Sequence, residues 1–284
     1  MLVSYIIPSF NHDKYIFDAL NSIKTDIFCE HEIIILDDGS TDMSAQVVSQ
    51  WIQQNNSLNI QFIQQTNQGV CYSINKLLGL SKGDFIRLVG SDDQIIPGST
   101  EILIDALNHD DSKLVAFGDS QTIDSQGRLL SNSHIDFLKK NKDMYKKDLK
   151  KAIISEWAVV GPVLVYRKDF MSQVGSYDES ILIEDWNMYL RLAGLEKIVF
   201  VDTPVAKYRV HEANTSRTRD VQKRIQNLSS QYTGGARSLK YFNGRHLNLL
   251  KSELYLTEAK IEFLKKNVIQ LAIKLIKYGY SKLK

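Results

Sequence analysis

Over about the first 110 residues, short apolar runs alternate with stretches whose apolar positions recur at helical spacing. Val, Ile and Leu dominate the apolar runs, which are at 2–7, 31–36, 59–64 and 84–89. The stretches with helical spacing are at 14–23, 42–51, 68–80 and 97–107. This βαβαβαβ order predicts a mostly parallel sheet with helices on both faces.

Three polar clusters directly follow predicted strands: Pro8-Ser9-Phe10-Asn11, Asp37-Asp38 and Ser91-Asp92-Asp93. The carboxyl ends of parallel strands meet at one edge of a sheet, which is where open α/β sheets bind their ligands. The spacing of the clusters therefore predicts one shared site.

The second half of the chain has a more mixed pattern. We predict strands at 114–123, 161–166, 197–201 and 205–208, and helices at 168–174 and 185–192. The lysine-rich segment 134–151 indicates a mobile loop or an exposed helix. From Thr218 onward the pattern is helical and basic.

Charge changes this picture only at the C-terminal end. A net charge of +2 is too small to favour nucleic acid, but from Asp220 onward thirteen Lys or Arg face four Asp or Glu. The first residues lack the features of a signal peptide, and no run approaches the roughly 20 apolar residues of a membrane span. The two cysteines are typical of reduced thiols, so we expect a cytoplasmic protein.

Ser91-Asp92-Asp93 places two carboxylates side by side after the fourth predicted strand. Adjacent carboxylates are costly unless a cation or water lies between them. Hard oxygen ligands suit Mg²⁺ or Mn²⁺, which bridge to the oxygens of a diphosphate. An ordinary surface turn is the alternative, because Ser and Asp are common in turns.

Asp37, Asp38 and Phe10 are candidates for binding a nucleobase. A carboxylate at a strand end can accept a hydrogen bond from a base N–H, as in uracil or thymine. An aromatic ring at the same edge can stack on the flat base. An Asx-capped turn and a core phenylalanine are the alternatives.

Candidates for the remaining chemistry lie later in the chain. Asp185, with Glu184, is a candidate general base for an acceptor hydroxyl, although a helix cap is the commoner role. His211 is a candidate metal ligand or phosphate contact, with a surface histidine as the alternative. Trp157 and Trp186 are candidates for stacking on an acceptor sugar, with core packing as the alternative.

In their order and spacing these motifs resemble the inverting family 2 glycosyltransferases of bacterial surface-polysaccharide synthesis. The matching segments are 6–11, 35–42, 67–69, 83–86, 91–93, 184–186 and 208–216. The resemblance implies a GT-A fold, which is Rossmann-like with a mostly parallel sheet flanked by helices. It also implies a catalytic domain over 1–217, with a donor half at about 1–110 and an acceptor half at about 111–217. A helical extension over 218–284 would follow.

The resemblance also implies roles for individual residues. The donor-binding set would be Pro8, Ser9, Phe10, Asn11, Asp37, Asp38, Asn67, Gly69, Ser91 and Asp92. Asp93, with Asp92 and His211, would hold Mn²⁺ or Mg²⁺. Asp185 would be the catalytic base, with Glu184 as its partner.

The implied reaction moves one sugar from a UDP- or dTDP-linked donor to a hydroxyl of a glycan or lipid-linked glycan, with inversion. Where many relatives have Ala-Arg-Asn, this chain has Ser73-Ile74-Asn75, so one donor contact differs. A sugar-1-phosphate nucleotidyltransferase is one alternative, but the segment 8–14 lacks the glycine-rich loop expected of that class. A non-catalytic sugar-nucleotide-binding subunit is the other alternative.

The basic tail has two interpretations. Apolar residues and lysines alternate over 256–276, which is typical of a helix that lies on an anionic membrane surface. A helical extension that packs on the catalytic domain or forms a homodimer is the alternative. The expected cytoplasmic location therefore leaves open a peripheral attachment to the inner face of the plasma membrane.

Overall fold

The computed structural model describes residues 1–182, 185–212, 214 and 218–282, and the chain divides into two compact units. The first unit comprises Met1–Lys139, Val159–Glu179 and Lys197–Val210. The second comprises Lys140–Ala158, Ser180–Glu196 and His211–Lys284. The second unit thus includes three segments from within the predicted catalytic domain (140–158, 180–196 and 211–217), and the division at residue 217 stays a prediction.

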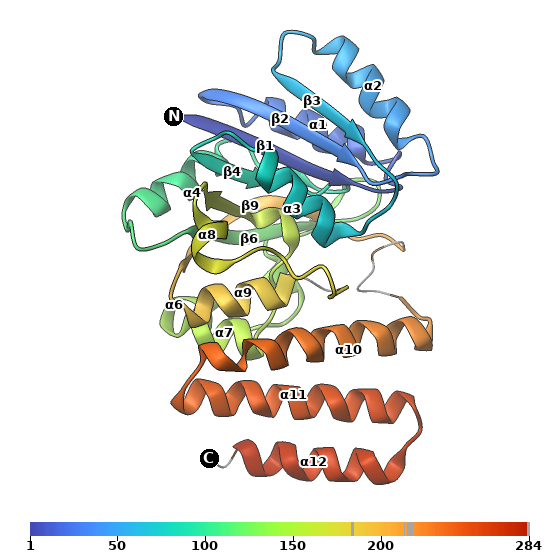
Figure 1. The fold of residues 1–284 in the computed structure, drawn as a ribbon, viewed down its shortest axis with the longest axis vertical. Coiled ribbons are helices and arrows are strands. Elements are labelled where there is room, and N and C mark those ends of the chain that lie inside the picture. Colours follow the sequence, from blue (N-terminus) through green and yellow to red (C-terminus); the bar gives the residue numbers. More distant parts are fainter. Residues whose placement is uncertain (183–184, 213, 215–217, 283–284) are drawn as a thin grey trace. The chain divides into compact units, whose positions relative to one another are not determined.

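The first unit is built on a nine-stranded sheet (Figure 1). Its order is β3-β2-β1-β4-β8-β6-β9-β5, and β7 pairs with β6. The pairs β3–β2, β2–β1, β1–β4 and β6–β9 are parallel, whereas β8 runs antiparallel between β4 and β6. The strands are β1 (Leu2–Ser9), β2 (Glu30–Asp37), β3 (Ile60–Gln64), β4 (Phe85–Leu88), β5 (Gln94–Ile95), β6 (Val115–Ile123), β7 (Leu129–Ser131), β8 (Leu164–Arg167) and β9 (Ile198–Arg209).

Helices cover this sheet through regularly spaced apolar residues. In α1, Ile16, Ala19, Leu20 and Ile23 are buried, which is one face of a helix. Because β1 and β2 are covered on both faces, their apolar residues run continuously rather than alternating. The helices of this unit are α1 (Ile16–Lys24), α2 (Ser44–Gln54), α3 (Val70–Leu80), α4 (Ser99–Asn108), α5 (His134–Phe137) and α8 (Phe170–Val174). The α/β class predicted from the sequence is confirmed.

Two predicted elements differ in the structure. The strands expected at 197–201 and 205–208 form one strand, β9, whose register against β6 shifts next to Gly118 and Asp119. Pro204 lacks an N–H for the ladder, so the shift accommodates it without ending the strand. The expected strand at 161–166 begins only at Leu164, after a 3₁₀ turn over Gly161–Val163.

The lysine-rich segment 134–151 forms short helices, and most of its side chains are exposed or half-buried. It contains α5, α6 (Lys142–Lys147) and the start of α7 (Leu149–Ser155). His134, Ile135 and Tyr145 are buried, so apolar and aromatic side chains hold this segment despite its lysines.

The second unit is helical. Its helices are α6, α7, α9 (Asp185–Gly194), α10 (Val221–Ser238), α11 (Gly244–Leu264) and α12 (Val268–Lys282). Figure 1 shows α10, α11 and α12 side by side, consistent with the contacts of α11 with both neighbours. Gly235 allows the close approach of α10, since a Cβ there would lie 2.6 Å from a methyl of Leu254 and 2.8 Å from the Trp186 ring.

The amphipathic helix predicted at 256–276 is divided between α11 and α12. The break lies at Lys265–Asn267, where Lys266 has a φ of 60° in the left-handed region. Within the described residues, no helix is both long and apolar enough to cross a membrane.

Candidate active site

The loops after β1 and β2 are tied together by hydrogen bonds. Asn11 has a φ of 54°, and its backbone N–H donates to Ser40 Oγ at 2.9 Å. Its side-chain oxygen accepts from Thr41 N at 2.8 Å. His12 N donates to Ser44 Oγ at 2.9 Å. These bonds hold the carboxyl ends of two neighbouring strands in one fixed arrangement.

Asp42 reinforces the same junction. Its carboxylate accepts from Ser44 N at 2.9 Å and from Asp13 N at 3.1 Å. Burial acts to raise the pKa of Asp42, but the hydrogen bonds from Ser44 and Asp13 outweigh it and hold the pKa below its usual value. The ionised carboxylate thus fastens the start of α2 to the loop after β1.

Two buried polar atoms at these strand ends have no hydrogen-bond partner among the described residues: Ser9 Oγ and Asp37 Oδ2. Ser9 and Asp37 are opposite each other in the β1–β2 register, and each is 2% exposed. Asp37 Oδ1 accepts from Ser40 N at 3.0 Å. An unsatisfied buried oxygen is costly, so this pair indicates a place where ligand polar groups complete the bonding.

Asp38 has the opposite character. Its Oδ1 accepts from Gln65 Nε2 and Gln68 N, both at 2.8 Å, and its Oδ2 accepts from Gly69 N at 2.9 Å. Asp38 therefore fixes the loop before α3, which contains the candidates Asn67 and Gly69. Gly39 is required beside it, because its φ is 76° and a Cβ would lie 2.8 Å from Asn67 N. Of the two adjacent carboxylates, Asp37 is better placed for a base.

Phe10 is not a core residue. Its side chain is 43% exposed although it directly follows buried Ser9. Pro8 is half-buried within β1. An exposed aromatic ring at the end of a strand provides a surface on which a flat heterocycle can stack.

The Ser91-Asp92-Asp93 turn is held by Arg209 at the end of β9. Asp93 is 3% exposed, and its Oδ1 accepts from Arg209 N at 2.7 Å. Arg209 Nε donates to the carbonyl of Asp92 at 2.8 Å, and Nη2 lies 3.1 Å from Asp18 Oδ2. The guanidinium also lies over the Tyr15 ring, 4.9 Å from its centroid.

The two carboxylates of this turn consequently differ in role. Asp93, expected from the sequence to be the main metal ligand, faces inward and anchors the backbone of β9. Asp92 faces His12, whose Nε2 lies 3.6 Å from Asp92 Oδ2. His12 Nδ1 lies 2.7 Å from Ser91 Oγ, a contact that fixes the orientation of the ring.

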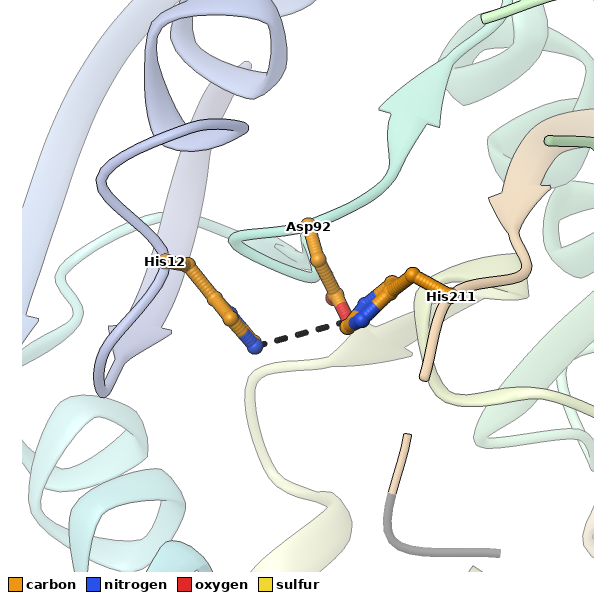
Figure 2. A group of neighbouring side chains, drawn as sticks. All are labelled: His12, Asp92 and His211. Carbon is orange, nitrogen blue, oxygen red and sulfur yellow. Dashed lines mark ion pairs between the residues drawn. The ribbon is translucent and has the colours of Figure 1, made fainter. Parts of the chain in front are cut away.

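His12, Asp92 and His211 each offer a ligand atom, and these atoms lie within 4.8 Å of one another. Figure 2 shows the three side chains pointing toward one another, with the His12–Asp92 ion pair dashed. His211 follows Val210 by one peptide bond, so the end of β9 sets its position. Two imidazoles and a carboxylate fit a divalent transition-metal ion better than Mg²⁺, which prefers oxygen ligands only.

Sequence reasoning did not identify His12 as a functional residue. His12 directly follows the Pro8–Asn11 cluster, so the sequence pattern alone could have placed it at the carboxyl edge of the sheet with the other candidates. A lone histidine in a loop is ordinary, however, and its partners Ser91 and Asp92 lie about eighty residues away along the chain.

The candidates for acceptor chemistry lie in the second unit. Asp185 is half-buried at the first position of α9, and Glu184 lies outside the described residues. Trp186 is 3% exposed and donates its indole N–H to the Ile153 carbonyl at 2.8 Å. Trp157 packs edge-on against Tyr189, with ring centroids 5.3 Å apart. Both tryptophans line a cavity of about 740 Å³.

Comparison with known proteins shows the family of this chain. The family model described as "Glycosyl transferase family 2" matches residues 4–175. The chondroitin synthase of Escherichia coli is 28% identical over 224 residues, which cover 78% of this chain and 31% of that protein. Glycosyltransferase GlyA of Streptococcus pneumoniae is 24% identical over 226 residues, which cover 76% of this chain and 31% of that protein. The chain thus spans about a third of the length of these relatives.

Solved structures support the fold. TarS 1–349 of S. aureus in complex with UDP-GlcNAc has a TM-score of 0.61 at 17% identity, covering 100% of this chain and 93% of that one. The mannosyltransferase PcManGT of Pyrobaculum calidifontis, in complex with GDP-Man and Mn²⁺, has a TM-score of 0.65 at 14% identity. That match covers 95% of this chain and 75% of that one.

The sheet with its flanking helices is a GT-A-like fold. The chain belongs to glycosyl transferase family 2, since the match covers well over half of its length.

Proposed function

We propose that this chain transfers one sugar from a UDP- or dTDP-linked donor to a hydroxyl of a glycan or lipid-linked glycan, with inversion at the anomeric carbon. The observation that carries the proposal is the pair of orphaned buried atoms, Ser9 Oγ and Asp37 Oδ2, beside exposed Phe10. A setting in bacterial surface-polysaccharide synthesis agrees with family membership and the relatives.

The nucleoside would bind at the ends of β1 and β2. Asp37 Oδ2 would accept the N–H of uracil or thymine, and Ser9 Oγ would bond a second polar atom of the nucleoside. Phe10 would stack on the base, with Pro8 and Asn11 bordering it. Asn67 and Gly69 belong to the loop that Asp38 fixes, so they would meet the donor from the side of α3.

A divalent ion would be held by His12, Asp92 and His211 rather than by Asp93. The residue types fit Mn²⁺, and Ser91 already fixes the His12 ring. When bound, the ion neutralises the charge that develops on the leaving diphosphate. The structurally similar mannosyltransferase was solved with Mn²⁺, which supports Mn²⁺ as the kind of ion.

Asp185 would be the base that takes the proton from the acceptor hydroxyl. The hydroxyl oxygen then attacks the anomeric carbon as the bond to the diphosphate oxygen breaks, which inverts the configuration. Asp185 lies at the first position of α9, where a carboxylate interacts favourably with the helix dipole. Trp157 is half-buried and lines a cavity in the same unit, where an acceptor sugar would stack on it. Trp186 lines the same cavity but is buried, so it would support the wall rather than stack on the sugar.

Calorimetric titration with UDP, dTDP and GDP in the presence of Mn²⁺ tests the donor site. We expect the pyrimidine nucleotides to bind more tightly, and Asp37→Asn to weaken uridine binding by about tenfold, since a charge-assisted hydrogen bond is lost. Arg128→Gln is the control, because Arg128 is exposed and pairs only locally with Asp124. If GDP binds as tightly as UDP and Asp37→Asn does not change nucleotide binding, the assignment of Asp37 to the nucleobase is wrong.

Turnover assays separate the alternatives. Slow hydrolysis of a UDP- or dTDP-linked sugar with Mn²⁺ supports a transferase. Release of pyrophosphate from a nucleoside triphosphate and a sugar 1-phosphate would instead indicate the nucleotidyltransferase. Tight nucleotide-sugar binding with no turnover of any donor would indicate the non-catalytic subunit.

A further inference from the structure

The apolar side of α12 faces away from the helix that α12 packs against. Six of its large side chains are exposed: Val268 (74%), Ile269 (75%), Ile273 (39%), Leu275 (46%), Ile276 (72%) and Tyr280 (63%). At 3.6 residues per turn they fall within one arc of about 160°. We call this set the α12 apolar face.

The contact with α11 comes from the other side of α12. Leu271, Lys274 and Tyr278 are half-buried there, and Lys274 Nζ lies 2.7 Å from Glu258 Oε1. The hydrogen bond and charge of Glu258 raise the pKa of Lys274, so this inward lysine stays charged. A mixed polar side thus packs inward while the most hydrophobic side is left open. Patches of this kind mark interaction sites.

Charge identifies the kind of partner. No acidic residue follows Glu262 in the sequence, whereas six lysines do. The two nearest acids are already paired, Glu258 with Lys274 and Glu262 with Lys265. An apolar face flanked only by lysines complements an anionic, apolar surface. A symmetric contact with a second copy would instead bring the same lysines together.

The α12 apolar face also adjoins the cavity of the second unit. Leu275 belongs to both, and Phe263 lines the cavity while being 68% exposed. The α12 apolar face is therefore continuous with the apolar lining of the cavity.

We propose that the α12 apolar face binds the surface of an anionic lipid bilayer. The helix would lie in the plane of the interface, with its apolar arc among the acyl chains and its lysines at the headgroups. Its fifteen residues span about 22 Å. This is shorter than the roughly 30 Å hydrocarbon core, so the helix would rest on the bilayer and not cross it. The proposal concerns location and does not depend on the reaction.

Co-sedimentation of the full chain with vesicles tests the proposal. We expect binding to vesicles of phosphatidylcholine mixed with phosphatidylglycerol, and weak binding to phosphatidylcholine alone. The double variant Ile269→Glu and Ile276→Glu should bind the mixed vesicles at least about tenfold less tightly, because two exposed anchors are lost. Gln270→Glu is the matched control, since it adds a negative charge to an exposed position of α12 outside the apolar arc. It should change binding by no more than about threefold.

Two further measurements keep the result unambiguous. Circular dichroism should show unchanged helix content in all variants, because the substituted side chains are exposed. Light scattering gives the mass in solution. Equal vesicle binding by wild type and double variant would overturn the proposal. So would a wild-type dimer that ignores vesicles and that the double variant converts to a monomer, since the face would then join two copies.

Discussion

The two units hold their functional groups by different means. In the first unit, carboxylates at strand ends are fastened by backbone N–H groups: Asp38 by Gln68 and Gly69, and Asp93 by Arg209. In the second unit, Asp185 occupies a helix start, and the cavity is lined by side chains from several helices. The first arrangement is rigid because the sheet fixes it, whereas the second depends on how helices pack.

This difference explains where each step of the proposed reaction would be located. Donor binding and charge neutralisation need fixed dipoles, which parallel strand ends supply. Acceptor binding would depend on the side chains that line the cavity, and helices can change their lining residues without disturbing a sheet. Four predictions test this difference between the two units.

Asp185→Asn should have the largest effect. Loss of a general base lowers kcat by about 10²- to 10⁴-fold, while the Kd for the donor nucleotide stays within about twofold, since the nucleotide would bind in the other unit. Turnover assays and calorimetry measure the two quantities. Asp220→Asn is the control, because Asp220 caps α10 at another helix start of the same unit. A variant at Asp185 with near wild-type kcat would end the assignment.

Substitutions of Asp92 and of Asp93 should have different effects on metal binding and on stability. Asp92→Ala should weaken Mn²⁺ binding by at least about tenfold and leave the free energy of unfolding nearly unchanged. Asp93→Ala should lower the free energy of unfolding by about 2 kcal/mol, since the buried N–H of Arg209 loses a charged acceptor. Metal titration and denaturant unfolding distinguish them. The reverse pattern would restore Asp93 as the main ligand.

Phe10→Ala should weaken UDP binding by about 1 kcal/mol, roughly fivefold in Kd, because base stacking is lost. Phe17→Ala is a matched control, since Phe17 in α1 is 44% exposed against 43% for Phe10. Calorimetry with UDP compares the two variants. Equal losses would show that exposed aromatic area alone, and not stacking at the strand end, accounts for the effect.

The smallest effect concerns Asp148, which caps α7 and lies 3.0 Å from His246 Nε2. Burial acts to raise the pKa of Asp148, but the Lys151 backbone N–H and His246 lower it below its usual value. A depressed carboxyl pKa stabilises the fold above the unfolded pKa of about 3.9, and this stabilisation is lost as pH falls through the lower folded pKa.

Asp148→Asn should therefore cost about 1 kcal/mol near neutral pH and progressively less below about pH 4. Denaturant unfolding across this pH range measures the effect. Asp143→Asn provides the comparison, because its pair with Lys147 is exposed and contributes almost nothing. A pH-independent loss at Asp148 would show that its charge does not matter.

The sequence by itself determined the alternation of strands and helices over about the first 110 residues, apart from the two-residue strand β5, and the three polar clusters at the strand ends. Both follow from local patterns. Buried parallel strands have continuous apolar sequences, and the residues that follow these strands meet at one edge of the sheet. The order of those clusters was also enough to indicate the family, which the match over residues 4–175 confirms.

Only the tertiary structure decided how neighbouring residues divide their roles. Asp37 has an orphaned oxygen while Asp38 is saturated, and Asp93 anchors Arg209 while Asp92 faces His12. The partners of Asp38, Asp92 and Asp93 in these contacts lie 27 to 116 residues away along the chain, which no local pattern reveals. The same holds for α12, whose amphipathic sequence does not say which side packs inward. That choice depends on the contacts of α11, and it leaves the apolar side exposed.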